Sequence, residues 1–133
     1  MANMKILESS EDYLERILML REEKKEVHSV DLAKMMSYSK PSVSRAVKKL
    51  KELSLITVDS SGAISLTEEG YRIANETYQK HKFFSRFLED IGVNKPTAVA
   101  DACRIEHALS EESFEAIKKY IRNSCQDIDD KSK

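Results

Sequence analysis

The stretch Ser37-Tyr38-Ser39-Lys40-Pro41-Ser42-Val43-Ser44-Arg45-Ala46-Val47-Lys48-Lys49-Leu50 decides the fold, because a polar turn leads directly into a basic amphipathic helix. Proline suits the first turn of a helix but not its interior, so a helix is predicted to start here. Its apolar residues recur at i, i+3, i+4, i+7 and i+10, which predicts one buried stripe. They are Val43, Ala46, Val47, Leu50 and Leu53.

The segments on either side extend this pattern. A short helix from Ser29 to Met36 is predicted before the turn, and a short helix, a turn and a longer basic helix form the helix-turn-helix pattern. Two β-branched runs, 55–59 and 63–67, follow around Gly62 and predict a β-hairpin. A hairpin directly after such a helix predicts the wing of a winged helix. An ordinary pair of packed helices is the alternative.

Charge is concentrated in the same region. Five basic residues stand against one acidic residue between Ser37 and Glu52, whereas the whole chain has a net charge of −1. A solvated helix face would also explain this charge, but the helix-turn-helix context favours contact with DNA phosphates. The predicted DNA-binding residues are Ser39, Lys40, Pro41, Ser42, Ser44, Arg45, Lys48 and Lys49.

The remaining segments predict a second, helical lobe. A first helix is expected from Ser10 to about Lys24, a long bridging helix from Thr67 to about Leu88, and two further helices after Asn94 and Ser110. We therefore predict a mainly α fold with a winged-helix DNA-binding domain at 1–70, a helical metal-binding and dimerisation domain at 71–122 and a polar, disordered tail at 123–133. Large apolar residues in the second lobe predict a dimer interface: Phe83, Phe84, Phe87, Leu88, Phe114 and Ile117.

Composition argues against membrane and disulfide-rich classes. No apolar run approaches the ~18 residues of a membrane span, and the first residues lack the apolar core of a secretory signal. We therefore expect a cytoplasmic protein with no membrane partner, in which Cys103 and Cys125 remain thiols.

Two groups of side chains that can act as metal ligands predict a metal site. Cys103, Glu106 and His107 stand at i, i+3 and i+4 of a predicted helix and so share one face, while Asp12 and Glu15 form a second pair near the other end of the chain. Each residue alone has an ordinary explanation, such as a buried thiol or a solvated carboxylate. Together they fit a transition metal of intermediate softness, with iron(II), cobalt(II), nickel(II), zinc(II) and manganese(II) all open.

Four motifs resemble the diphtheria toxin repressor family of metal-dependent regulators, and especially its short branch, the manganese transport regulators, which lack the SH3-like domain. The motifs are Ser10-Glu11-Asp12-Tyr13-Leu14-Glu15, Ser39-Lys40-Pro41-Ser42-Val43-Ser44, Leu66-Thr67-Glu68-Glu69-Gly70 and Cys103-Arg104-Ile105-Glu106-His107-Ala108-Leu109-Ser110. The resemblance covers nearly all of residues 8–122. It implies a homodimeric repressor that binds double-stranded operator DNA when a divalent metal, Mn²⁺ or Fe²⁺, is bound.

The resemblance also implies the ligands. The primary site falls on Asp12, Cys103, Glu106 and His107, and a second site draws on Glu15 and His81.

This chain departs from both branches of the family. The manganese branch normally has a bridging glutamate at the position of Cys103, which makes a two-metal cluster doubtful, and the iron branch has methionine at the position of Asp12. Ser85 and Val99 replace the glutamate and histidine of the iron branch's ancillary site, so that site is not expected.

Two other functions remain open from the sequence. One is a winged-helix regulator that responds to an organic ligand or to oxidation of Cys103 without a metal corepressor. The other is a metalloenzyme, which is disfavoured because nothing resembles an oxyanion hole or a substrate-binding loop. We therefore expect that the protein is not an enzyme and has no small organic substrate.

Overall fold

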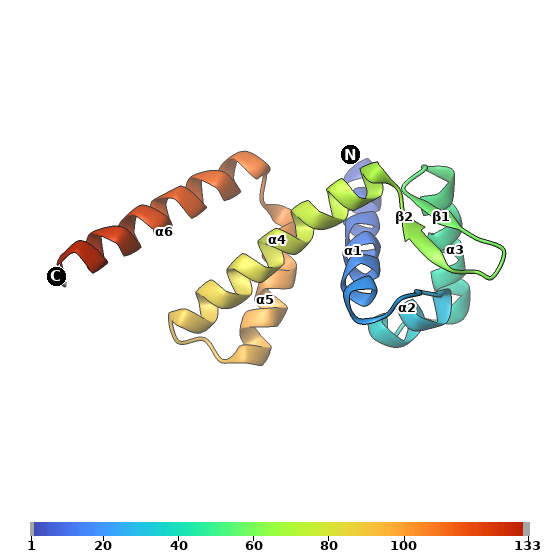
Figure 1. Ribbon diagram of the computed structural model, residues 1–133, viewed down its shortest axis with the longest axis horizontal. Helices are drawn as coiled ribbons and strands as arrows, with labels where there is room; N and C mark the ends of the chain where they lie inside the picture. The colour runs from blue at the N-terminus through green and yellow to red at the C-terminus, as the bar shows by residue number, and fades with distance from the viewer. Residues whose placement is uncertain (1, 132–133) are drawn as a thin grey trace.

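The structure is a computed structural model that describes residues 2–131, and it confirms a mainly α fold with one small hairpin (Figure 1). The first lobe contains α1 (Ala2–Glu23), α2 (Ser29–Met36), α3 (Lys40–Glu52), β1 (Ile56–Val58) and β2 (Ile64–Leu66). The second contains α4 (Glu68–Asp90), α5 (Lys95–Ala108) and α6 (Glu111–Lys131). None of the helices described is long and apolar enough to cross a bilayer.

The helix-turn-helix forms where the sequence predicts it. The side chain of Ser39 caps α3 by accepting a hydrogen bond from the backbone N–H of Ser42, and Pro41 lies in the first turn. Helix α2 begins at Ser29 as predicted, and its N-cap is His28, the residue before it. The backbone N–H of His28 donates to Asp31 Oδ2 at 2.8 Å, so the carboxylate three residues on fixes this helix start.

The wing is an antiparallel hairpin in which Ile56 pairs with Leu66 and Val58 with Ile64. Its loop is held by Asp59, whose Oδ1 accepts hydrogen bonds from the backbone N–H groups of Ser61 and Ala63, both at 2.9 Å. The hairpin is therefore ordered by its own loop as well as by its strand pairing.

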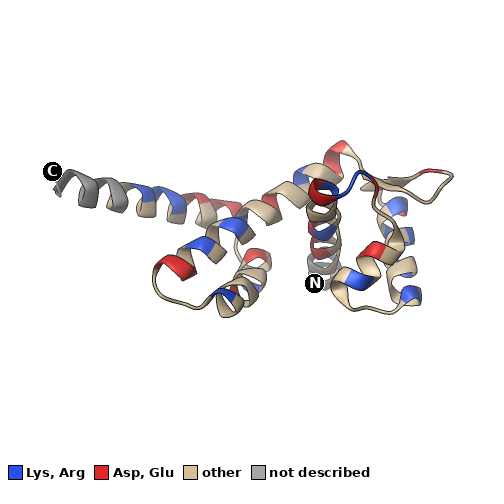
Figure 2. Cartoon of the chain, turned by 60° about the horizontal axis from the view of Figure 1, so that its bottom comes forward, with Lys and Arg blue, Asp and Glu red and all other residues tan. Residues whose placement is uncertain are grey.

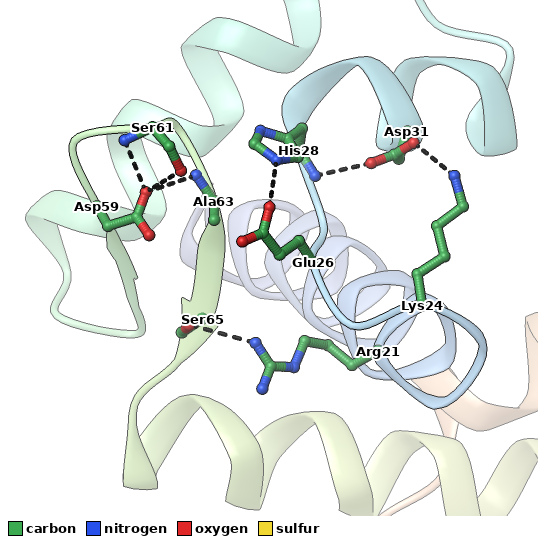
Figure 3. A network of polar contacts seen from close by, with 9 residues as sticks. All are labelled: Arg21, Lys24, Glu26, His28, Asp31, Asp59, Ser61, Ala63 and Ser65. Atoms are coloured by element: carbon green, nitrogen blue, oxygen red, sulfur yellow. Dashed lines mark hydrogen bonds and ion pairs between the residues drawn. The ribbon is translucent and has the colours of Figure 1, made fainter.

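Polar contacts join the wing to α1, and the segment after α1 to α2 (Figure 3). Arg21 of α1 donates to Ser65 Oγ at 3.3 Å, and Lys24 Nζ lies 2.9 Å from Asp31 Oδ1. The backbone of Val27 also accepts a hydrogen bond from the N–H of Ile64 at 2.7 Å. These contacts fix the wing relative to the helix-turn-helix.

The first lobe has its own hydrophobic core, to which α1 contributes Tyr13, Leu14 and Ile17. Val43 and Leu50 of α3 are buried in it as the apolar stripe predicts, whereas Leu53 is exposed. Leu53 is the C-cap residue, so it lies beyond the last turn that faces the core.

The junction between the wing and α4 is very tight. Thr67 caps α4 by accepting from the N–H of Gly70 at 3.1 Å, and it donates its own hydroxyl to the carbonyl of Ser54. A Cβ placed on Gly70 would lie only 1.9 Å from the carbonyl oxygen of Leu55. Glycine is therefore required at this point of contact between backbones.

Helix α4 continues without interruption from the wing into the second lobe (Figure 1). The expected boundary at residue 70 falls within its first turn. Phe84, Ala102 and Phe114 form the buried centre of the second lobe, while Phe83, Phe87 and Ile117 are only partly buried around it. Apolar surface thus remains at the edge of this cluster, as the sequence predicted.

Two helix boundaries differ from the expected ones. Helix α1 begins at Ala2 rather than at Ser10, so Ser10 is not its cap, because residues 2–9 are free of helix-breaking glycine and proline. Helix α6 continues to Lys131, whereas the sequence analysis expected a disordered tail from residue 123. No proline or glycine lies between residues 111 and 131, and Ile117, Ile121 and Ile128 keep a helical spacing. The side chain of Cys125 lies outside the described residues.

Candidate metal centre

Three helices bring the predicted metal ligands together. Helix α1 carries Asp12 and Glu15, helix α4 carries His81, and helix α5 carries the remaining ligands. Both α1 and α5 pack against α4, so residues almost a hundred positions apart in sequence meet in one cluster. The cluster therefore lies where α1 and α5 pack on α4, and Figure 1 shows these helices where the two lobes join.

The first group of candidate ligands is formed by Asp12, Cys103 and Glu106. One donor atom from each lies within 4.8 Å of the other two. His107 is not part of this close group, but its Nε2 lies 3.3 Å from Glu106 Oε1 and 3.9 Å from Asp12 Oδ1. An open cavity of about 630 Å³, lined in part by Asp12, Cys103 and His107, gives access from the surface.

The second group is formed by Glu15, His81 and Glu106, again with donor atoms within 4.8 Å of one another. All three residues are buried. Glu106 belongs to both groups. Because Cys103 replaces a bridging carboxylate, the family pattern made a two-metal cluster doubtful, but the structure supplies a shared carboxylate from Glu106.

Several polar atoms of the cluster have no hydrogen-bond partner among the described residues. The buried atoms without a partner are both carboxylate oxygens of Glu15, both carboxylate oxygens of Glu106, Asp12 Oδ1 and His81 Nδ1. His81 Nδ1 lies 2.9 Å from Glu106 Oε2, but the two atoms do not have the geometry of a hydrogen bond. Burying such groups unpaired is costly, and a divalent cation would satisfy them. The residues present therefore fit a metal.

The environment strongly perturbs the acidities of these side chains. Burial, followed by the neighbouring Glu106, raises the pKa of Glu15 to about 8, and burial raises the pKa of Glu106 itself to about 7. Burial also raises the pKa of the Cys103 thiol to about 11. Around neutral pH much of the cluster thus carries protons that a metal ion would have to displace.

The two histidines shift in opposite directions. Burial lowers the pKa of His81. Burial also acts to lower the pKa of His107, but Asp12 and Glu11 outweigh it and raise that pKa to about 10. His81 is therefore the histidine that is better prepared to act as a neutral ligand.

Two residues of the cluster were missed by the sequence analysis. Glu11 Oε2 lies 3.1 Å from His107 Nδ1, so Glu11 orients the imidazole. Arg16 contacts Asp12 and Cys103. Their signals were present in the sequence, since Glu11 precedes Asp12 and Arg16 follows it by one helical turn.

Seven of the eight predicted DNA-binding residues are exposed on α3 or at its N-cap, Ser39, and Ser42 is partly buried. Lys40, Ser44, Arg45, Lys48 and Lys49 are all exposed, while Val43 and Leu50 face the core. Figure 2 shows the basic residues along the outer side of this helix, at the end of the molecule farthest from α6. The surface is suited to contact with phosphates.

Comparisons with known proteins agree with this arrangement. The sequence matches the family described as "Iron dependent repressor, N-terminal DNA binding domain" over residues 5–63, and the family described as "Iron dependent repressor, metal binding and dimerisation domain" over residues 67–132. Together the two matches extend over nearly the whole chain.

Individual relatives cover the same region. An uncharacterized HTH-type transcriptional regulator of Methanocaldococcus jannaschii is 37% identical over 116 residues, which are 86% of this chain and 93% of the relative. The transcriptional regulator MntR of Escherichia coli O157:H7 is 34% identical over 112 residues, which are 84% of this chain and 72% of the relative. The structure of the manganese regulator SloR matches with a TM-score of 0.75 and 31% identity over 85% of this chain and 53% of that chain. This chain thus spans about half the length of that solved structure.

Proposed function

We infer that this chain, which belongs to the family of iron-dependent repressors, is a divalent-metal-dependent transcriptional repressor that regulates metal homeostasis. The observation that carries the proposal is the buried cluster of unpaired carboxylate and imidazole atoms at the junction of the two lobes. We assign the protein no catalytic role. Action on DNA implies that it works in the cytoplasm.

We assign the primary metal site to Asp12, Cys103, Glu106 and His107, and a second site to Glu15 and His81 with Glu106 shared. When bound, a divalent metal would neutralise the carboxylates and the thiolate that converge here. Because Asp12 and Glu15 come from α1 and the other ligands from α4 and α5, the liganded cluster joins the DNA-binding lobe to the helical lobe.

The position of α1 links this cluster to the DNA-binding surface. Tyr13, next to Asp12, is buried in the core of the first lobe. Its ring centroid lies 6.2 Å from that of Tyr38, in the turn that leads into α3. A restraint on α1 at Asp12 therefore also restrains the turn before the recognition helix.

We propose that the protein binds its operator as a homodimer. The incompletely buried Phe83, Phe87 and Ile117 supply apolar surface for contact with a second copy. Two recognition helices that enter successive major grooves must lie about 34 Å apart. Fixing the two lobes of each protomer would reduce the ordering cost of reaching that spacing, so metal and DNA would strengthen each other's binding.

Manganese and iron are the metals that the family favours, and SloR is named a manganese regulator. Cys103 keeps zinc, cobalt and nickel open, since thiolate is a softer ligand than carboxylate. The thiol also bears on the alternative of oxidation sensing. A pKa of about 11 leaves Cys103 protonated, which makes it a poor redox sensor.

The test is a fluorescence anisotropy titration with DNA from the promoter of the chain's own gene or of neighbouring metal-transport genes, with Mn²⁺ or with a chelator. We expect tight binding only with the metal, and loss of this metal dependence in Asp12→Ala and His107→Ala. Asp101→Ala removes a half-exposed carboxylate from α5 and serves as the matched control. Equal DNA binding with metal and with chelator would refute the proposal.

A further inference from the structure

The cluster contains a positively charged side chain in direct contact with the proposed ligands. Arg16 lies on α1 one turn after Asp12, and its Nε is 3.5 Å from Asp12 Oδ1. Its Nη2 donates to Cys103 Sγ of α5 at 3.3 Å. Two of the three residues of the first ligand group therefore already interact with a cation that the chain itself supplies.

A guanidinium and a divalent metal cannot share these atoms without cost. Arginine keeps its charge at all accessible pH values, so it repels a metal ion a few ångströms away. The sulfur of Cys103 must also present a lone pair to the metal, and in the structure it accepts the N–H of Arg16.

The side chain of Arg16 also has room to move away from these two residues. Its side chain is 22% exposed, and its Nη1 already faces Met19 Sδ, one turn farther along α1, at 3.7 Å. The flexible stem of arginine allows the charged group to move into solvent while the stem stays packed.

We propose that Arg16 is an internal competitor of the metal, which occupies Asp12 and Cys103 and must leave them before a divalent cation can bind there. The inference rests on the proposed function. In this arrangement Arg16 weakens metal binding and sets the metal concentration at which the protein responds. It also keeps α1 close to α5 when metal is scarce.

The test compares dissociation constants for Mn²⁺ and Zn²⁺, measured by competition with a fluorescent chelator. Arg16→Gln removes the charge and is expected to bind both metals about tenfold more tightly or more. Arg16→Met, which keeps the apolar stem beside Met19, provides a second neutral variant and should behave likewise. Arg16→Lys keeps the charge and should stay within about threefold of the unsubstituted protein.

Arg21→Gln removes an exposed arginine from the same helix and should leave metal affinity unchanged. As a second readout, thermal unfolding in chelator should show that Arg16→Gln is less stable than the unsubstituted protein, because Asp12 and Cys103 lose their partner. Unchanged or weaker metal binding in both neutral variants would overturn the inference, as would equal tightening in Arg16→Lys. Failure of the unsubstituted protein to bind metal would instead count against the proposed function.

Discussion

Replacing Glu15 by glutamine should make the metal-free protein more stable at alkaline pH. The carboxylate is fully buried, and its pKa is raised from 4.5 to about 8. A group whose pKa is raised by folding contributes stability below its unfolded pKa and loses that contribution as pH rises through the folded value. The metal-free protein should therefore lose stability between about pH 4.5 and pH 8 as Glu15 ionises.

The size of the effect follows from the shift. At about 1.4 kcal/mol per pKa unit, the upper limit is about 5 kcal/mol. Relaxation and water entry around the ionised carboxylate should reduce the observed change to about 2 kcal/mol. For a chain of this size that corresponds to roughly 8 °C in Tm. Glutamine cannot ionise, so the variant avoids this loss.

The assay is thermal unfolding in chelator at pH 5, 7 and 8.5. The variant and the unsubstituted protein should have similar Tm values at pH 5, and the variant should be the more stable at pH 8.5. Glu23→Gln, an exposed carboxylate on the same helix, is the control. The reasoning would be refuted if the Tm difference between Glu15→Gln and the unsubstituted protein were the same at all three pH values.

Other predictions concern the metal, the junction and the DNA surface. Because Glu15 and Glu106 have pKa values of about 8 and 7, metal affinity should rise from pH 6 to pH 8 with release of protons, and calorimetry in buffers of different ionisation enthalpy would detect that release. Cys103→Glu should shift activation toward manganese, and an unaltered ranking of metals in DNA-binding titrations would contradict this. Gly70→Ala should destabilise the fold by about 3 kcal/mol in denaturant unfolding, because its Cβ would collide with the Leu55 carbonyl; a loss below about 1 kcal/mol would show that the junction can relax. Arg45→Ala should weaken DNA binding and make it less dependent on salt, and an unchanged salt slope would remove Arg45 from the interface.

Periodicity and turn chemistry were sufficient to predict the winged helix from sequence. The apolar stripe from Val43 to Leu50 and the glycine turn at Gly62 are local signals, and the structure places both as expected. Helix ends were harder to predict. Ser10 and Ser29 are good capping residues, but α1 begins at Ala2. His28 is the N-cap of α2, because its backbone N–H donates to the carboxylate of Asp31.

The candidate metal centre was only partly accessible from sequence. The spacing of Cys103, Glu106 and His107 places them on one helix face, and the spacing of Asp12 and Glu15 pairs them in the same way. His81 was supplied only by the family resemblance. The sharing of Glu106 between two groups depends on how α1, α4 and α5 pack, which no local pattern encodes. The same holds for Arg16, because its contact with Cys103 joins residues 87 positions apart.

Because α4 is one continuous helix, a small change in its tilt at the metal cluster would produce a larger displacement at the DNA-binding lobe. His81 lies 13 residues from the start of the helix at Glu68, which corresponds to an arm of about 20 Å. A tilt of about 10° at His81 would therefore displace the wing end by about 3 Å. Because the first turn of α4 packs against the backbone of Leu55 at Gly70, that displacement would carry the wing with it, toward the DNA or away from it.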